Sequence, residues 1–426
     1  MAAYIESYYD DTRCVSLTDT SSLAGSSKAD VAVVGGGVTG CSTALHLAER
    51  GYKVALLEAN RVGWGASGRS GGQILNGFGT DLSVMAKFLG REGMQQAWEM
   101  SLEAVRMTAE RVDKHDIPCD LAWGAIEVAV KQRHMRAFAE HIRSMRDHYG
   151  YDEYEWLDRD ALHEHVRSRA YAGGILDPNS GHLHPLNYTL GLARAAENAG
   201  AAIHENSAVR ELKHGRTVRL VTDNGELEAE FAVLAGNAYL GGDVAPELRG
   251  RIMPVGNYIV ATEPLSDEQV AQTLPQNDAV ADANFVLDYY HLSGDRRMLY
   301  GGQVSYGHKP PRRLRERMAT KLAGLFPALK DVHMDYQWGG LVGITINRAP
   351  HFGRIDDNIY FAQGYSGHGM ALAGLSGRLM AEAIGGQAER FDLYTKIRHR
   401  RFPGGEKFRT PLLVLATNFY RMRDLL

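Results

Sequence analysis

Three glycines with a fixed spacing are the first residues in this chain that suggest chemistry. Gly35, Gly37 and Gly40 follow a short apolar run, 31–34, and lead into a segment with helical apolar spacing, 41–50. In such a strand–turn–helix unit the first glycine permits a tight turn and the second lets the backbone approach a pyrophosphate. The third glycine lets the helix pack closely on the strand, and the helix start offers free N–H groups to the phosphates. The spacing therefore predicts a site for a dinucleotide.

An acidic residue completes this unit. Residues 53–57 predict the next strand, and Glu58 stands at its end, 21 residues after Gly37. A carboxylate at this place would accept hydrogen bonds from ribose hydroxyls and would repel a 2′-phosphate, which disfavours NADP. The alternative is a structural βαβ unit without a ligand. Further contacts to the nucleotide are predicted for Val38, Thr39 and Ala59.

A second glycine-rich segment bears on the choice between FAD and NAD, which share this fingerprint. Five glycines fall within residues 63–72, so the segment cannot form a packed helix. It suits a backbone that wraps around an extended ligand and meets phosphate and isoalloxazine atoms with N–H groups and a serine hydroxyl. This favours FAD; the alternative is a mobile glycine loop. The predicted contacts are Gly65, Ala66, Ser67, Gly68, Gly71, Gly72 and Gln73.

The remaining elements predict an interleaved α/β architecture rather than separate domains in a row. Helical patterns fall at 82–149, 186–200, 313–326 and 369–385, and strand patterns at 123–130, 202–204, 218–222, 231–234, 251–261, 298–304 and 359–362. We expect a discontinuous Rossmann-like FAD-binding domain from residues 29–80, 181–245 and 340–400. A mixed-sheet substrate domain would come from residues 81–180 and 246–339, with 401–426 as a C-terminal extension.

The composition is that of an ordinary globular protein. Of the 426 residues 44% are hydrophobic, and 47 basic against 51 acidic side chains leave a net charge of −4, which disfavours nucleic acid as a partner. Cys14, Cys41 and Cys119 form no CxxC pair, and their odd number favours reduced thiols. With no signal-peptide pattern and no apolar run long enough for a membrane span, we expect a cytoplasmic protein.

Two histidine pairs raise the question of a metal. The i, i+2 spacing of His163 with His165, and of His182 with His184, puts both rings on one face only in a strand. Neither pair has an evident third ligand, so no metal site is expected.

Five segments give the chain a resemblance to a known family. Residues 65–73, 181–186, 235–240, 363–369 and 402–405 resemble the D-amino acid oxidase family of flavoproteins, which includes glycine, sarcosine and amine oxidases. Within it the chain is most similar to the γ-glutamylputrescine oxidases. The resemblance implies a fold like that of glycine and sarcosine oxidases. It also assigns further cofactor contacts to Val209, Ala235, Gly236, Asn237, Gly364, Tyr365, Gly367, His368, Gly369 and Met370.

The resemblance also bears on the substrate. Amino acid oxidases of the family hold the substrate carboxylate with arginines, at positions where this chain has Val342 and Gly367. This favours an amine, or an acid whose carboxylate is held elsewhere. Predicted catalytic residues are His368, Tyr258, Tyr290 and Arg69, and further pocket candidates are Tyr289, Tyr306, His308 and Arg348. The alternatives are a capping role for the histidine and ordinary packing for the tyrosines.

The resemblance implies an FAD-dependent oxidation of a C–N bond to an imine, which water hydrolyses to an aldehyde and an amine. The expected substrate is a γ-glutamylputrescine-like amine; the alternatives are a small N-substituted amino acid or imino diacid, and a flavin-binding protein without catalysis. Oxygen or another acceptor would take the electrons.

Covalent attachment, which parts of the family make through cysteine or histidine, is not expected, because no histidine lies between Asn60 and Asn76 and no cysteine follows Cys119. Residues 410–426 could lie on a membrane surface, or pack against their own domain or a partner subunit. The oligomeric state stays open.

Overall fold

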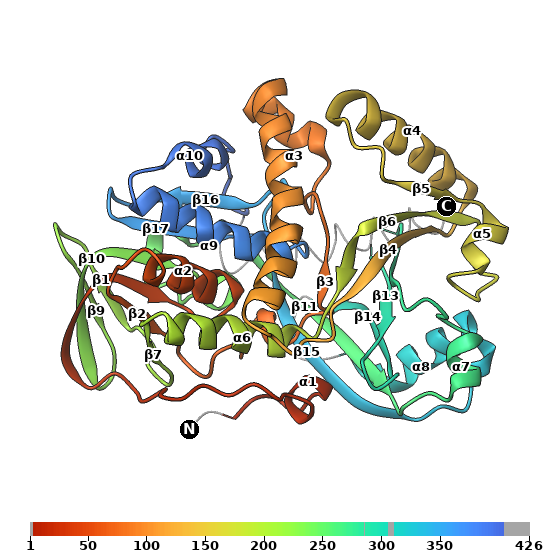
Figure 1. Cartoon of the computed structure of the whole chain (residues 1–426), viewed down its shortest axis with the longest axis horizontal. Coiled ribbons are helices and arrows are strands. Elements are labelled where there is room, and N and C mark those ends of the chain that lie inside the picture. Colours follow the sequence, from red (N-terminus) through yellow and green to blue (C-terminus); the bar gives the residue numbers. More distant parts are fainter. Residues whose placement is uncertain (1–2, 285, 306–310, 404–426) are drawn as a thin grey trace.

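Two β-sheets lie side by side in this protein, each with its own helices (Figure 1). The computed structural model describes residues 3–284, 286–305 and 311–403, with the backbone alone for 303–305. The predicted pocket residues Tyr306 and His308, and the segment 410–426, lie outside the described residues.

The first sheet has a parallel centre. Its order is β16 (His351–Arg354), β17 (Ile359–Gln363), β10 (Gly225–Leu234), β1 (Gly25–Val34), β2 (Val54–Leu57), β7 (Ala202–His204), and β9 (Val218–Val221) and β8 (Glu211–Lys213) extend it from β10. The strands β17, β10, β1, β2 and β7 pair in parallel, while β16 pairs antiparallel at the edge. All four residues of β2 and all five of β17 are buried, as expected for parallel strands covered on both faces.

Helices cover this sheet and reach the border of the second one. They are α2 (Val38–Ala48), α6 (Pro185–Asn198), α9 (Met370–Ile384) and α10 (Glu389–Thr395). The long α3 (Leu82–Lys114) stands between the two halves in Figure 1 and packs on α9. Its chain kinks at Gly90, where φ is +69°.

The second sheet is mixed. Its order is β15 (Met334–Ile344), β11 (Met253–Thr262), β14 (Met298–Ser305), β13 (Tyr289–Leu292), β12 (Ala279–Asp282), β4 (Ala122–Ala129), β6 (Gly173–His182), β3 (Gln73–Ile74), with β5 (Glu155–Leu157) on β6. Only β4 and β12 pair in parallel among these described strands. The helices of this half are α4 (Gln132–Tyr149), α5 (Arg159–His163), α7 (Asp267–Ala271) and α8 (Leu314–Leu325), and α1 (Tyr8–Asp11) lies near its border with the first half. Short 3₁₀ turns span Ala66–Gly68, Asn237–Tyr239, Pro246–Leu248 and Pro327–Leu329.

The predicted interleaving is confirmed, since each sheet collects strands from several separated parts of the chain. The sequence patterns missed β3, β5, β8, β12, β13 and β16, which have only two to four residues, and β6 and β15, whose glycines and polar residues break the usual apolar alternation. The domain bounds stay a prediction. The strand β15 runs across the predicted bound at residue 340, and α3, from the predicted substrate domain, packs on α9. No helix in the described ranges is long and apolar enough to cross a membrane.

The crossing of α2 and α9 gives a stability prediction. A Cβ on Gly377 would lie 2.6 Å from the Thr43 nitrogen and 2.8 Å from the Thr39 carbonyl oxygen. We expect Gly377→Ala to lower the free energy of unfolding by about 1–3 kcal/mol, because the helices must separate. The matched control is Gly324→Ala in α8, where a Cβ meets nothing within 4 Å and helix propensity favours alanine. Denaturant titration of both variants measures the difference; equal stabilities would contradict it.

Candidate active site

The glycine turn between β1 and α2 is built for close backbone packing. Gly35 has a φ of +108°, and a Cβ on Gly40 would lie 1.9 Å from the Gly35 carbonyl oxygen. Only glycine at position 40 therefore lets α2 start directly against the turn. Gly37 is the N-cap and provides no side-chain cap; instead the Val38 N–H donates to the Ser67 hydroxyl at 3.0 Å. The turn and the second glycine-rich segment are thus bonded to each other.

Glu58 lies beside this turn and is held by the backbone. Its Oε2 accepts from the Gly36 N–H at 2.7 Å and its Oε1 from the Asn60 N–H at 2.8 Å. Burial raises the pKa of Glu58, and these backbone donors oppose that shift. Each carboxylate oxygen keeps a second lone pair for a ligand hydroxyl.

The glycines of the second segment are required by protein neighbours. A Cβ on Gly68 would lie 2.2 Å from the Gly63 carbonyl oxygen, and one on Gly72 would lie 2.0 Å from that of Leu183. A Cβ on Gly71 would lie 2.5 Å from the Tyr289 ring. The glycine density thus reflects tight packing against the second sheet and α6 as well as any ligand.

The start of α9 joins the same site. The Gly364 N–H donates to the Asn237 side chain at 3.0 Å, and the Tyr365 hydroxyl lies 2.8 Å from that of Thr39. His368 Nε2 lies 2.6 Å from the Asn76 carbonyl oxygen, which can only accept, so Nε2 carries the proton. Burial lowers the pKa of His368, with a smaller contribution from the Arg348 charge, so the ring is neutral. His368 therefore fastens this helix start to the segment after β3.

These parts surround one cavity of about 1400 Å³ to which both sheets contribute. The predicted residues that line it are Gly35, Gly37, Thr39, Glu58, Ala59, Gly65, Ala66, Ser67, Arg69, Gly71, Gly72, Gln73, Val209, Ala235, Gly236, Asn237, Tyr365, Gly367, His368, Gly369 and Met370, together with Tyr289 and Arg348 from the further candidates. Val38, Gly40, Gly68 and Gly364 lie behind this lining, where they shape the turns.

Two predicted catalytic tyrosines do not reach the cavity. Tyr290 is fully buried, donates to the Tyr171 hydroxyl at 2.9 Å and stacks with Tyr300. Tyr258 also belongs to the apolar core on the far side of the second sheet. The reason is the alternation of side chains along a strand: Tyr289 faces the cavity, so its neighbour Tyr290 faces the opposite side.

Arg69 brings a positive charge to the cavity wall. Its guanidinium lies over the Trp64 ring, 4.0 Å from the centroid, and Nε donates to the Trp64 carbonyl oxygen. Among the described residues Nη2 is buried without a hydrogen-bond partner. Burial lowers the pKa of Arg69, although an arginine stays charged near neutral pH.

Acidic side chains that the sequence analysis did not select also line the cavity. Glu127 from β4 and Asp282 from β12 do so, and no described side chain forms an ion pair with either. Burial, reinforced by Asp282, raises the pKa of Glu127 to about 7, and burial raises that of Asp282 to about 6. A single charged residue within an otherwise apolar strand is the signal that could have identified both.

The comparisons with known proteins agree with this geometry. The sequence profile of the FAD dependent oxidoreductase (DAO) family matches residues 30–383, and the chain belongs to that family. It is an FAD-dependent oxidoreductase, as predicted from the glycine-rich segments.

Individual relatives cover nearly the whole chain. It is 42% identical over 397 residues to the gamma-glutamylputrescine oxidoreductase of Escherichia coli, covering 93% of each protein. It is 39% identical to a probable oxidoreductase, OrdL, of Haemophilus influenzae, covering 99% of this chain and 97% of that protein. Its fold is similar to the crystal structure of glycine oxidase from Geobacillus kaustophilus, with a TM-score of 0.73, 23% identity and coverage of 88% and 100%.

Glu58 gives a prediction for cofactor binding. We expect Glu58→Ala to weaken FAD binding about 10- to 100-fold, because the variant loses a charged acceptor for the ribose hydroxyls. The quenching of FAD fluorescence during titration of the apoprotein measures this affinity. Glu211→Ala, an exposed change in β8, is the control and should bind FAD like the unchanged protein. If Glu58→Ala bound FAD with unchanged affinity, Glu58 would not contribute to FAD binding.

Proposed function

We propose that this protein oxidises the C–N bond of a γ-glutamylputrescine-like amine to an imine, which water then hydrolyses to an aldehyde and an amine. The identity of 42% with the E. coli gamma-glutamylputrescine oxidoreductase over 93% of both chains supports this substrate class. Oxygen or another acceptor would receive the electrons.

The charge distribution of the cavity is the observation that carries the proposal. Val342 and Gly367, where amino acid oxidases of the family place arginines, both line the cavity and bring no positive charge. Glu127 and Asp282 bring carboxylates instead. A cavity with unpaired carboxylates favours a ligand that carries an ammonium group.

The residues present fit FAD, and each has a defined task in the proposal. The turn at Gly35 and Gly37 would hold the pyrophosphate and Glu58 the ribose, while the start of α9 would lie against the flavin. The chemistry that FAD supplies when bound is removal of a hydride equivalent from the carbon next to a neutral amine. Glu127 would bind the substrate ammonium and, with a pKa of about 7, could accept its proton.

Arg69 supports the second candidate, a small N-substituted amino acid or imino diacid. Its Nη2 has no hydrogen-bond partner among the described residues and could donate to a substrate carboxylate. Arg348 also lines the cavity. A long zwitterionic amine could use both charges, whereas glycine or sarcosine would leave the Glu127 carboxylate on β4 without a partner; Asp282 on β12 already accepts from the Asn284 backbone and side chain.

Anaerobic mixing of the FAD-loaded protein with an amine panel tests the proposal. We expect γ-glutamylputrescine to bleach the flavin absorption band, and putrescine, sarcosine, glycine and iminodiacetate to do so weakly or not at all. Bleaching by a diacid or small amino acid alone would establish the second candidate. No bleaching by any amine, with FAD tightly bound, would indicate a flavin-binding protein without this activity. Peroxide release in air then identifies oxygen as the acceptor.

The raised pKa of Glu127 gives a pH prediction. Glu127 is neutral below about pH 7 and charged above it, so KM for a cationic amine should fall as pH rises through 7. Glu127→Gln should raise KM about tenfold or more at pH 8, through loss of a charge-assisted bond, and remove this dependence. Asp282→Asn should move the transition to lower pH, because it removes a like charge.

The control for these variants is Glu155→Gln on β5, whose side chain is exposed. It should leave KM and its pH dependence unchanged. If Glu127→Gln kept the KM of the unchanged enzyme at every pH, Glu127 would not take part in substrate binding.

A further inference from the structure

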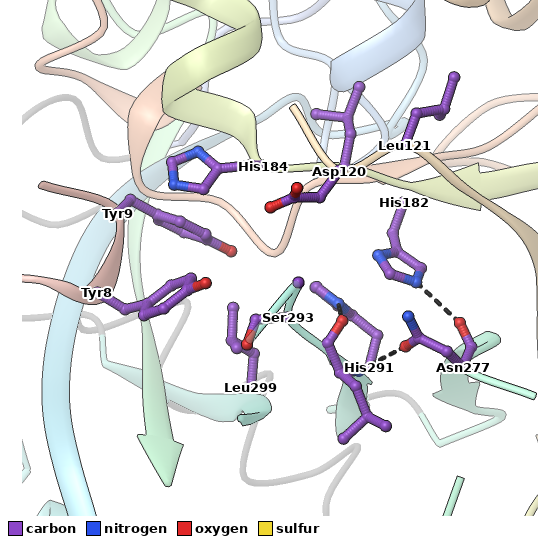
Figure 2. A pocket seen from close by; sticks show the side chains of 13 residues that line it. Tyr8, Tyr9, Asp120, Leu121, His182, His184, Asn277, His291, Ser293 and Leu299 are labelled. Carbon is purple, nitrogen blue, oxygen red and sulfur yellow. Dashed lines mark hydrogen bonds between the residues drawn. The ribbon is translucent and has the colours of Figure 1, made fainter. Parts of the chain in front are cut away.

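A second, smaller cavity lies behind the glycine-rich segment that borders the large one. It has a volume of about 200 Å³, and α1, the end of β6 and the loop after β13 contribute to its wall (Figure 2). The chain at Gly71 and Gly72 separates it from the large cavity. The His291 Nε2 lies 2.8 Å from the Gly71 carbonyl oxygen, and the Leu183 N–H donates to the Gly72 carbonyl oxygen at 3.0 Å.

Tyr9 presents an unused polar group to this second cavity. Its side chain is 1% exposed, its ring packs against those of His184 and Trp338, and its hydroxyl is buried without a partner among the described residues. Figure 2 shows the Tyr9 hydroxyl turned toward the open centre. A buried phenol left without a hydrogen bond is unfavourable, so this position favours a ligand with a polar group.

Asp120 gives the second cavity its charge. It lines the mouth, and no described side chain forms a hydrogen bond or ion pair with its carboxylate. Partial burial, and then the nearby Asp295, raise its pKa. Asp295 itself already accepts from Tyr8 and pairs with Arg297, so the charge on Asp120 is the one without a partner.

Burial disfavours a positive charge on the histidines of this cavity. His184 Nδ1 accepts from the Asn187 N–H, so Nε2 carries the proton toward Thr12, and burial lowers its pKa to about 4. Burial also lowers the pKa of His182 and of His291, whose ring centroids lie 4.0 Å apart, although the Leu292 and Gly71 carbonyl oxygens beside the His291 nitrogens oppose that shift. His182 donates from Nε2 to the Asn277 carbonyl oxygen, which leaves Nδ1 as an acceptor.

We propose that this second cavity is a binding site for a short primary alkylammonium ion. Three N–H donors would meet the Asp120 carboxylate and the Tyr9 hydroxyl oxygen, and the apolar part would lie against the rings of Tyr8, Tyr9 and His184. The cavity holds only a few heavy atoms, so the long substrate proposed for the large cavity does not fit it. The site is therefore distinct from the one that holds the reacting amine.

Calorimetric titration of the FAD-loaded protein with tert-butylammonium at pH 8 tests this site. The probe has no C–H bond next to its nitrogen, so it cannot be oxidised wherever it binds, and it stays charged as a lysine does. We expect saturable binding that Asp120→Asn weakens about tenfold or more and Tyr9→Phe several-fold. Asparagine tolerates the φ of +49° at position 120, so the first variant should keep its fold.

Two further variants and one neutral probe make the result specific. Asp331→Asn, an exposed change elsewhere, should leave binding of the probe unchanged, and Glu127→Gln should remove only the binding that the large cavity contributes. The neutral isostere tert-butanol should not bind. Absence of saturable binding, full binding in Asp120→Asn, or loss of binding in Glu127→Gln alone would each overturn the second site. Because the amine panel tests the large cavity separately, failure of one proposal does not decide the other.

Discussion

The contact between the β1–α2 turn and its neighbours is the constraint on which the rest of the structure depends. The helix α2 begins directly on the turn at Gly35, and its first N–H, that of Val38, donates to the Ser67 hydroxyl. Gly40 allows that approach, and Gly377 then lets α9 cross α2 at backbone distance. Since the start of α9 itself lines the large cavity, one tight crossing aligns two walls of the site.

Hydrogen bonds connect the other walls to this centre. Ser67 bonds to the start of α2, Asn237 to Gly364, and His368 to the Asn76 carbonyl oxygen. Each bond joins segments that are far apart in the chain. A small displacement of either sheet would therefore move several walls of the large cavity at the same time.

Desolvation determines the electrostatic character of both cavities. In the large one it raises the pKa of Glu127 and Asp282 into the neutral range and lowers that of Arg69, so the acids are the groups that titrate near neutral pH. In the small one it lowers the pKa of three histidines, and Asp120 is the charge without a partner among the described residues. Glu127 and Asp120 face their cavities without a charged partner among the described residues, so a cationic ligand would compensate both charges.

The sequence by itself determined the cofactor end of this protein. Gly35, Gly37, Gly40 and Glu58 are local in the chain, and their spacing follows from the geometry of one strand–turn–helix unit, so pattern alone predicts them as cofactor contacts. Only the tertiary structure decided the substrate end. Whether Tyr289 or Tyr290 faces the cavity depends on the register of β13, and Glu127 meets Asp282 only because β4 pairs with β12. Such pairings join distant residues, and no local spacing in the chain encodes them.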